Sequence, residues 1–160
     1  MQKSEGLQGG QTVQEILRSE WSREVREVQE LFRSRFGRAP DGVWLAPGRA
    51  NLMGEHTDYN QGYVLPFALR QGITAAAARR TDRRLALCSR QEPDFRAEIV
   101  LDALAPGQVT GWPAYPAGVA WALRSAGYEV PGADIAIDSD VPAGAGLSSW
   151  PRWSAPRRSR

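Results

Sequence analysis

The chain has 160 residues, a formal net charge of +2 and a sequence pI of about 9.0. This length allows one domain with its own hydrophobic core and is short for two ordinary domains. Acidic and basic residues alternate along most of the chain, so the sequence lacks the basic face with interleaved aromatic residues that is typical of nucleic-acid binding.

Cysteine and histidine usage excludes two further classes of protein. The chain has one cysteine, Cys88, which lies in an apolar run, and one histidine, His56. One cysteine cannot form a disulfide framework within the chain, and these two residues cannot assemble a zinc cluster of the usual kind. No apolar run reaches the length of a signal-peptide core or a membrane span, so we expect a cytoplasmic protein with no membrane partner.

The first predicted element is an amphipathic helix, because apolar residues recur at helical spacing between residues 11 and 36. An interruption at residues 19–22, with a disordered lead before a shorter helix, fits the sequence equally well. Thr12 and Glu15 fit a capping box, and Gly37 is well placed to end the helix. Residues 1–10 are polar and glycine-rich, and we expect them to form a disordered lead.

The rest of the chain alternates short apolar runs with turn residues. The predicted strands are Val43–Ala46, ended by Pro47 and Gly48, then Gly72–Ala78, Leu85–Ser89, Phe95–Leu101 and a strand around Ile135 and Ile137. A helix is predicted over Tyr115–Ala126, with Gly127 as its stop. This order predicts an α+β domain with a mixed or antiparallel sheet and packed helices.

The segment Gly48–Gly62 is dense in polar side chains of every hydrogen-bonding type. A polyol is recognised by short side chains that donate and accept in fixed directions, so Glu55, His56 and Asp58 form a plausible sugar cradle. Arg49 is a permanent cation with a planar donor fork, which suits a phosphoryl group. The same residue types also occur in surface ion pairs and in tight turns, so residue chemistry alone leaves both interpretations open.

Residues Gly48–Tyr59 strongly resemble the galactokinase signature, and the resemblance continues without a gap through the following residues 60–62 and 64–66. Galactokinases are members of the GHMP kinase superfamily, so the resemblance implies an N-terminal GHMP kinase domain. It also implies that Glu55, His56, Thr57 and Asp58 bind the sugar. By the same resemblance Arg49 binds substrate and stabilises charge on the transferred phosphoryl group, and is the catalytic residue that this chain retains.

A second motif, Val141–Ser149, follows the last predicted strand and is rich in glycine, alanine and serine. Such a loop can present successive backbone N–H groups to an anion, although loops of this composition often only turn the chain. It lacks the lysine of a Walker loop. Its position resembles that of the ATP-phosphate loop of GHMP kinases, which implies a nucleotide-binding role for Gly144, Ala145, Gly146, Leu147, Ser148 and Ser149.

The family pattern continues with a third serine and an alanine-rich helix, whereas this chain has Trp150 followed by Pro151. Residues 150–160 have an aberrant, Pro/Arg-rich composition, and we expect them to be disordered. Another reading frame of one permitted coding for this tail reads Ala-Ala-Leu-Glu-Arg-Thr-Ala-Ala-Leu-Ala, which fits the expected helix. We therefore hypothesise a truncation or frameshift near the phosphate loop, so that residues 11–149 form a partial GHMP kinase domain.

The resemblance implies ATP-dependent phosphorylation of galactose at its anomeric hydroxyl, with Mg²⁺ neutralising charge on the phosphates. In the family the base aspartate and the second lobe lie downstream, so we expect no retained metal site and negligible kinase activity from this chain alone. The expected partners are galactose and ATP, and the intact family member is expected to be a monomer. Two alternatives stay open: a non-catalytic galactose sensor, and a kinase for a related hexose such as an N-acetylated galactose.

Overall fold

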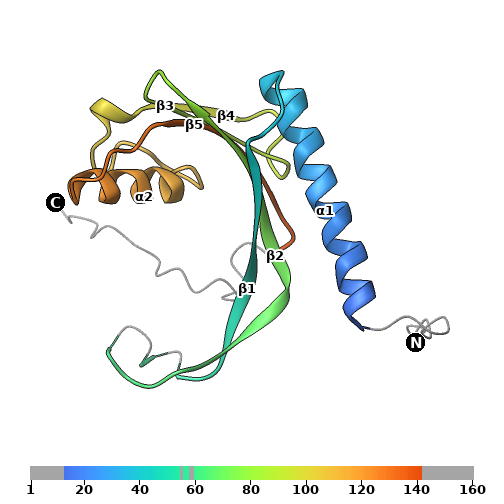
Figure 1. The fold of residues 1–160 in the computed structure, drawn as a ribbon. Coiled ribbons are helices and arrows are strands. Elements are labelled where there is room, and N and C mark those ends of the chain that lie inside the picture. The colour runs from blue at the N-terminus through green and yellow to red at the C-terminus, as the bar shows by residue number, and fades with distance from the viewer. Residues whose placement is uncertain (1–12, 55, 58–59, 142–160) are drawn as a thin grey trace. The chain divides into compact units, whose positions relative to one another are not determined.

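The computed structural model describes residues 13–54, 56, 57 and 60–141, with side chains described from residue 21 onward. The elements in chain order are α1 (Val13–Phe36), β1 (Gly42–Met53), β2 (Leu65–Arg80), β3 (Arg84–Ser89), β4 (Arg96–Val100), the short 3-10 helix η1 (Leu101–Ala103), α2 (Ala114–Ser125) and β5 (Gly132–Ser139), as Figure 1 shows. The five strands form one sheet in the order β1-β2-β5-β3-β4. Strand β3 pairs antiparallel with β4 and parallel with β5, which confirms the prediction of an α+β domain with a mixed sheet.

The helix predictions are confirmed within the described residues. Helix α1 ends at Phe36, and Gly37 adopts a left-handed φ of 68° while its N–H donates to the Arg33 carbonyl at 2.9 Å. Glycine suits this position because it has no Cβ to oppose positive φ. The expected cap at Thr12, the lead over residues 1–10 and the tail over residues 150–160 lie outside the described residues.

The prediction that the first strand ends at Pro47 is wrong, because β1 continues to Met53. Strand β1 is at one end of the sheet order, and an edge strand tolerates a proline that cannot donate a ladder hydrogen bond. The second strand is also longer than predicted and begins at Leu65 instead of Gly72. Arg49 therefore lies on a strand and not in a loop.

Two glycines allow β1 and β2 to approach each other closely. A Cβ added to Gly48 would lie 3.0 Å from the carbonyl oxygen of Gln71, and one added to Gly72 would lie 2.9 Å from that of Ala46. A side chain at either position would displace the neighbouring backbone. The two strands are consecutive in the chain and form a hairpin whose ends are joined by the segment from Gly54 to Val64.

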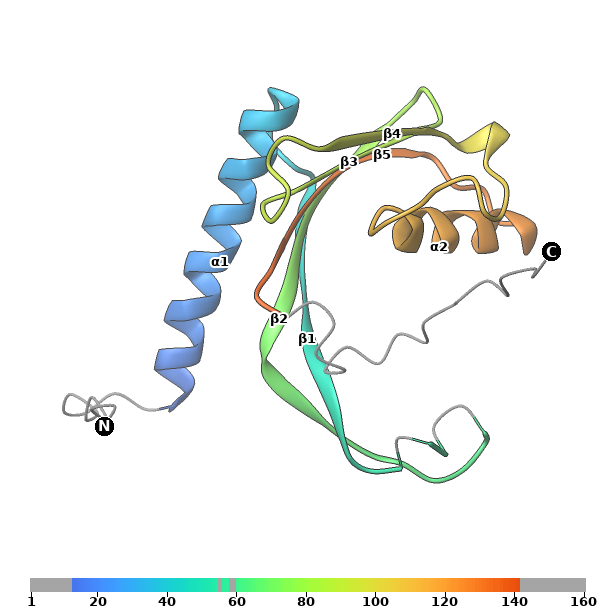
Figure 2. The ribbon, with the colours of Figure 1, turned by 180° about the vertical axis from the view of Figure 1, so that it is seen from behind.

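The chain divides into two compact units, the first formed by the described residues of Met1–Trp44 and Thr74–Asp138. In this unit α1 and α2 cover opposite faces of the β3, β4 and β5 strands, as Figures 1 and 2 show. Neighbouring residues of β3 point to opposite faces: Cys88 packs with Val28 and Phe32 of α1, and Leu87 packs with the buried alanines of α2. Burial raises the pKa of the Cys88 thiol, which behaves as a small apolar core residue.

A buried carboxylate connects three segments of the first unit. The Asp134 side chain on β5 is only 6% exposed, and it accepts hydrogen bonds from Arg38 at 2.7 Å and from Arg80 at 2.6 Å. Arg38 follows α1 and Arg80 ends β2. Two arginines thus compensate the desolvation of one carboxylate, which is the condition for burying a charge.

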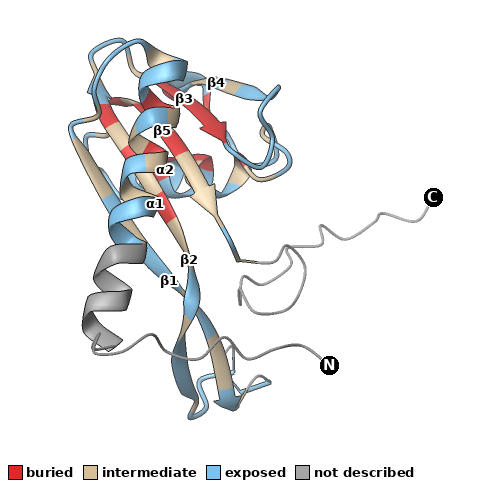
Figure 3. Cartoon of the chain, turned by 90° about the vertical axis from the view of Figure 1, so that its right-hand side faces the viewer, coloured by how far each residue is buried: buried red, intermediate tan, exposed pale blue. Residues whose placement is uncertain are grey.

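The second unit comprises the described residues of Leu45–Ile73 and Ser139–Arg160. None of its described residues is buried, whereas every buried core residue belongs to the first unit; Figure 3 shows the buried residues in red. Several large apolar side chains of this unit are exposed, among them Leu52, Met53, Tyr63 and Phe67. Among the helices of the described ranges, none has the length and apolar character needed to cross a membrane.

Candidate functional site

The first motif begins on β1 and continues into the loop that joins β1 to β2. Arg49 and Asn51 are two residues apart on β1 and therefore share one side of the strand. Arg49 is exposed, and Asn51 is half-buried. A strand holds a side chain more precisely than a flexible loop does, which suits the role predicted for the Arg49 guanidinium.

The loop is held by hydrogen bonds that centre on Thr57. The Thr57 N–H donates to the Gly54 carbonyl at 3.0 Å, and the Thr57 carbonyl accepts the N–H groups of Asn60 and Gly62, each at 3.0 Å. The Thr57 hydroxyl lies 3.0 Å from the Gly54 carbonyl oxygen and 2.9 Å from that of Tyr63. One residue thus contacts both ends of the loop.

Two glycines of the loop are required by its own packing. Gly54 has a φ of 98°, and a Cβ added there would lie 2.7 Å from the Tyr63 carbonyl oxygen. A Cβ added to Gly62 would lie 2.5 Å from the Cβ of Thr57. Contacts within the chain therefore explain why both positions are glycine.

His56 is exposed, and its backbone carbonyl accepts a hydrogen bond from the side-chain amide of Asn60 at 2.9 Å. Glu55 and Asp58, the two carboxylates of the expected sugar cradle, lie outside the described residues. The convergence of Arg49, Glu55, His56 and Asp58 on one sugar therefore stays a prediction. The expected nucleotide-binding residues 144–149 also lie outside the described residues.

The described start of the second motif lies beside the start of the first. A Cβ added to Gly48 would lie 3.4 Å from a methyl group of Val141, although 93 residues separate them in the chain (141 − 48). Asp140 fixes this arrangement, because its carboxylate accepts the Gly72 N–H at 2.6 Å and its own N–H donates to the Gly72 carbonyl at 3.3 Å. The structure thus brings the described starts of the two motifs together.

Sequence reasoning missed Asp140 and Gly72. A carboxylate directly after a strand is a common turn residue, and nothing in the linear sequence indicates that it bonds to a glycine 68 residues away. The signal that could have found them is the position of Asp140 immediately before the second motif.

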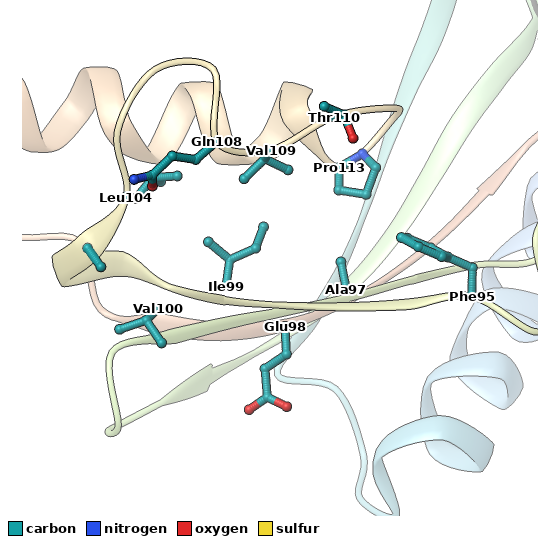
Figure 4. Close-up of a pocket in the computed structure, with 11 residues that line it drawn as sticks. Phe95, Ala97, Glu98, Ile99, Val100, Leu104, Gln108, Val109, Thr110 and Pro113 are labelled. Carbon is teal, nitrogen blue, oxygen red and sulfur yellow. The ribbon is translucent and has the colours of Figure 1, made fainter.

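A pocket of about 390 Å³ lies between β4 and the segment that follows it, within the first unit. Figure 4 shows Ala97 and Ile99 pointing toward Val109 and Pro113, while Glu98 points away. The Glu98 carboxylate instead pairs with Arg84 at 3.0 Å. No residue of either motif lines this pocket, so it is not the predicted site.

Two carboxyl groups with lowered pKa values also lie outside both motifs. Hydrogen bonds from Arg80 lower the pKa of Asp82 to about 2, and those from Arg83 lower the pKa of Asp102. Both carboxylates serve ion pairs within the first unit. These shifts therefore report structural pairing and do not locate a catalytic group.

Comparison with known proteins gives the site its context. Residues 30–79 match the family model described as the galactokinase galactose-binding signature. A galactokinase of Streptomyces coelicolor is 54% identical over 122 residues, which are 76% of this chain and 32% of that relative. The chain thus spans about a third of the length of this relative.

Two solved structures share the fold. The crystal structure of Lactococcus lactis galactokinase complexed with galactose matches with a TM-score of 0.69 and 36% identity, and covers 79% of this chain and 33% of that one. Mevalonate kinase of Methanococcus jannaschii matches with a TM-score of 0.54 over 66% of this chain and 34% of that one. At 20% identity, the second likeness shows the fold alone.

Proposed function

Because this chain is related to galactokinases and corresponds to their N-terminal portion, we propose that it carries the galactose-binding segment of an enzyme that phosphorylates galactose. The reaction transfers the γ-phosphoryl group of ATP to the anomeric hydroxyl of the sugar. The observation that carries the proposal is the meeting of Gly48 and Val141, where the galactokinase signature begins beside the start of the second motif. Phosphoryl transfer requires sugar and nucleotide to be held next to each other, and the approach of the two motif starts supports the proposal.

The proposed sugar ligands are Glu55, His56 and Asp58. Carboxylates accept hydrogen bonds from sugar hydroxyls, and an imidazole can donate or accept one. Arg49 is proposed to stabilise negative charge on the transferred phosphoryl group, because its guanidinium keeps its charge and presents several donors in one plane. Arg49 lies on β1, so its guanidinium extends from a hydrogen-bonded strand.

The proposed phosphate-binding segment is residues 144–149, where backbone N–H groups between glycines can bind the oxygens of ATP. Mg²⁺ would accompany the nucleotide, since it is commonly held by substrate phosphates together with one or two carboxylates. Among the described residues, no three His, Cys, Asp or Glu side chains gather as metal ligands, so no step is assigned to a protein-held ion. A cytoplasmic, monomeric enzyme is proposed for the complete protein.

Thermal unfolding with and without sugar tests the proposal. Ligand present at a hundred times its dissociation constant stabilises the native state by about 2.7 kcal/mol, which corresponds to a rise of about 5–10 °C in the melting temperature of a chain of this size. We expect galactose to produce this rise. Glucose, which differs from galactose in the configuration of one hydroxyl, should produce a smaller rise. Absence of any rise at saturating galactose would contradict the proposal.

Matched variants identify the residues responsible. Asp58→Asn keeps the shape of the side chain but replaces a carboxylate oxygen with a donor, and we expect it to abolish most of the galactose-dependent rise. Glu92→Gln makes the same kind of change in an exposed turn outside both motifs and should leave the rise intact. Equal responses of the two variants would argue against Asp58 as a sugar ligand.

A further inference from the structure

The Thr57 hydroxyl is positioned to hold the loop between β1 and β2 closed. It lies within hydrogen-bond distance of two backbone carbonyls, that of Gly54 at 3.0 Å and that of Tyr63 at 2.9 Å. A hydroxyl has one proton to donate. The Gly54 carbonyl already accepts the Thr57 N–H, so the Tyr63 carbonyl is the acceptor that depends on the hydroxyl.

The rest of Thr57 also packs against the loop. Gly62 leaves so little space that a Cβ added to it would lie 2.5 Å from the Thr57 Cβ and 3.2 Å from the Thr57 methyl group. The Thr57 carbonyl accepts the N–H groups of Asn60 and Gly62. Donor, acceptor and methyl group of this one residue are thus all engaged inside the loop.

We propose that Thr57 is a positioning residue of the galactose-binding segment, which sets the conformation of the loop and does not itself bind sugar. The proposal rests on the proposed function and replaces the expectation that Thr57 contacts the substrate. Its neighbour His56 is exposed and has its carbonyl held by the Asn60 side chain. The hydroxyl connects Gly54 to Tyr63, so its loss would free the segment that carries the predicted sugar ligands.

Three variants of the full chain separate the parts of this side chain. Thr57→Val keeps the branched shape and removes the hydroxyl, Thr57→Ser keeps the hydroxyl and removes the methyl group, and Thr57→Ala removes both. The first measurement is amide hydrogen exchange of the peptide covering residues 54–63 without sugar. We expect exchange to accelerate about 5- to 10-fold in Thr57→Val, as the loss of one hydrogen bond predicts, and to stay near the wild-type rate in Thr57→Ser.

The second measurement separates positioning from direct contact. Galactose and a set of deoxygalactoses, each lacking one hydroxyl, are titrated calorimetrically into wild type and Thr57→Val. A positioning residue weakens every sugar by the same factor, about 5- to 10-fold. A direct contact instead weakens all sugars except the analogue that lacks the contacted hydroxyl, and that pattern would overturn the proposal.

The two measurements keep this proposal distinct from the proposed function. Unchanged exchange of residues 54–63 in Thr57→Val overturns the positioning role whether or not the chain binds galactose. A wild-type chain that binds no galactose contradicts the proposed function, while its exchange data still decide whether the Thr57 hydroxyl holds the loop. Restored affinity and exchange in Thr57→Ser support the hydroxyl as the responsible group.

Discussion

Individual residues of this chain have roles that depend on what surrounds them. Gly48 and Gly62 both belong to the galactokinase signature, yet the first is needed because β2 passes 3.0 Å from where its Cβ would be, and the second because Thr57 occupies the equivalent space. Asp82 and Asp134 are both aspartates paired with Arg80, but Asp134 is buried and Asp82 is substantially exposed. An ion-paired aspartate therefore contributes differently to stability at the two positions.

The ion pair between Arg80 and Asp82 predicts a pH dependence at the residue scale. The pKa of Asp82 is lowered from its ordinary value to about 2 in the folded chain, with the Arg80 hydrogen bond as the main cause. A lowered folded-state pKa contributes stability that is complete above about pH 4 and is lost as the pH falls through about 2. We expect the difference in unfolding free energy between wild type and Asp82→Asn to shrink over this window.

Urea unfolding at a series of pH values measures this difference. Other carboxylates titrate in the same range, so the comparison with the variant is informative and the wild-type curve alone is not. Asp94→Asn removes an exposed carboxylate outside the ion pair and serves as the control. A wild-type to Asp82→Asn difference that is constant between pH 5 and pH 2 would rule out this role for the pair.

At the scale of elements, helix α1 stabilises the chain through one buried face. Val28 and Phe32 are fully buried against alanines of β2 and β5 and against Cys88 of β3. These strand residues are small, which lets the helix lie close to the sheet while Phe32 fills the remaining volume. The exposed residues of α1 contribute charge and little packing.

We expect Phe32→Ala to lower the unfolding free energy by about 3–5 kcal/mol, because it removes a large buried side chain and leaves a cavity. Arg33→Ala, one position further on the exposed side of the same helix, should change it by less than about 0.5 kcal/mol. Chemical denaturation followed by circular dichroism measures both. Comparable effects of the two substitutions would show that α1 does not pack as described.

At the scale of the whole molecule, the buried core residues and the predicted sugar-binding segment belong to different units. All buried core residues lie in the unit that contains α1, α2, β3, β4 and β5. The first motif and the described start of the second lie in the other unit, where no described residue is buried. Binding segments are commonly drawn from regions of low local stability, which a rigid core then supports.

This division predicts that amide hydrogens of the two units exchange at different rates. Amides of β3 should exchange last, because they are buried and paired on both sides, and amides of residues 45–73 should exchange first. Galactose should slow exchange in residues 45–73 and leave β3 unchanged, which mass spectrometry of peptic peptides can measure. Glucose serves as the control sugar. Protection of residues 45–73 equal to that of β3 in the absence of sugar would contradict the prediction.

The sequence by itself determined the elements with strong local signals. Helical periodicity and a glycine stop located α1, and short apolar runs between turn residues located β3 and β5, because these patterns depend on neighbours in the chain. The run of residues 48–62 carried the family likeness that the comparisons confirm. Local sequence also placed Cys88 in an apolar run, and the residue is buried in β3.

Only the tertiary structure decided how far β1 and β2 extend and what the polar loop residues contact. Pro47 is a strand breaker in sequence terms, yet β1 continues past it, because an edge strand needs no ladder donor there. The Thr57 hydroxyl, which the resemblance assigns to sugar binding, lies beside the Tyr63 carbonyl, and Asp140 bonds to Gly72. These partners are distant in the chain or depend on the exact course of the backbone. They therefore cannot be predicted from residue types and spacing alone.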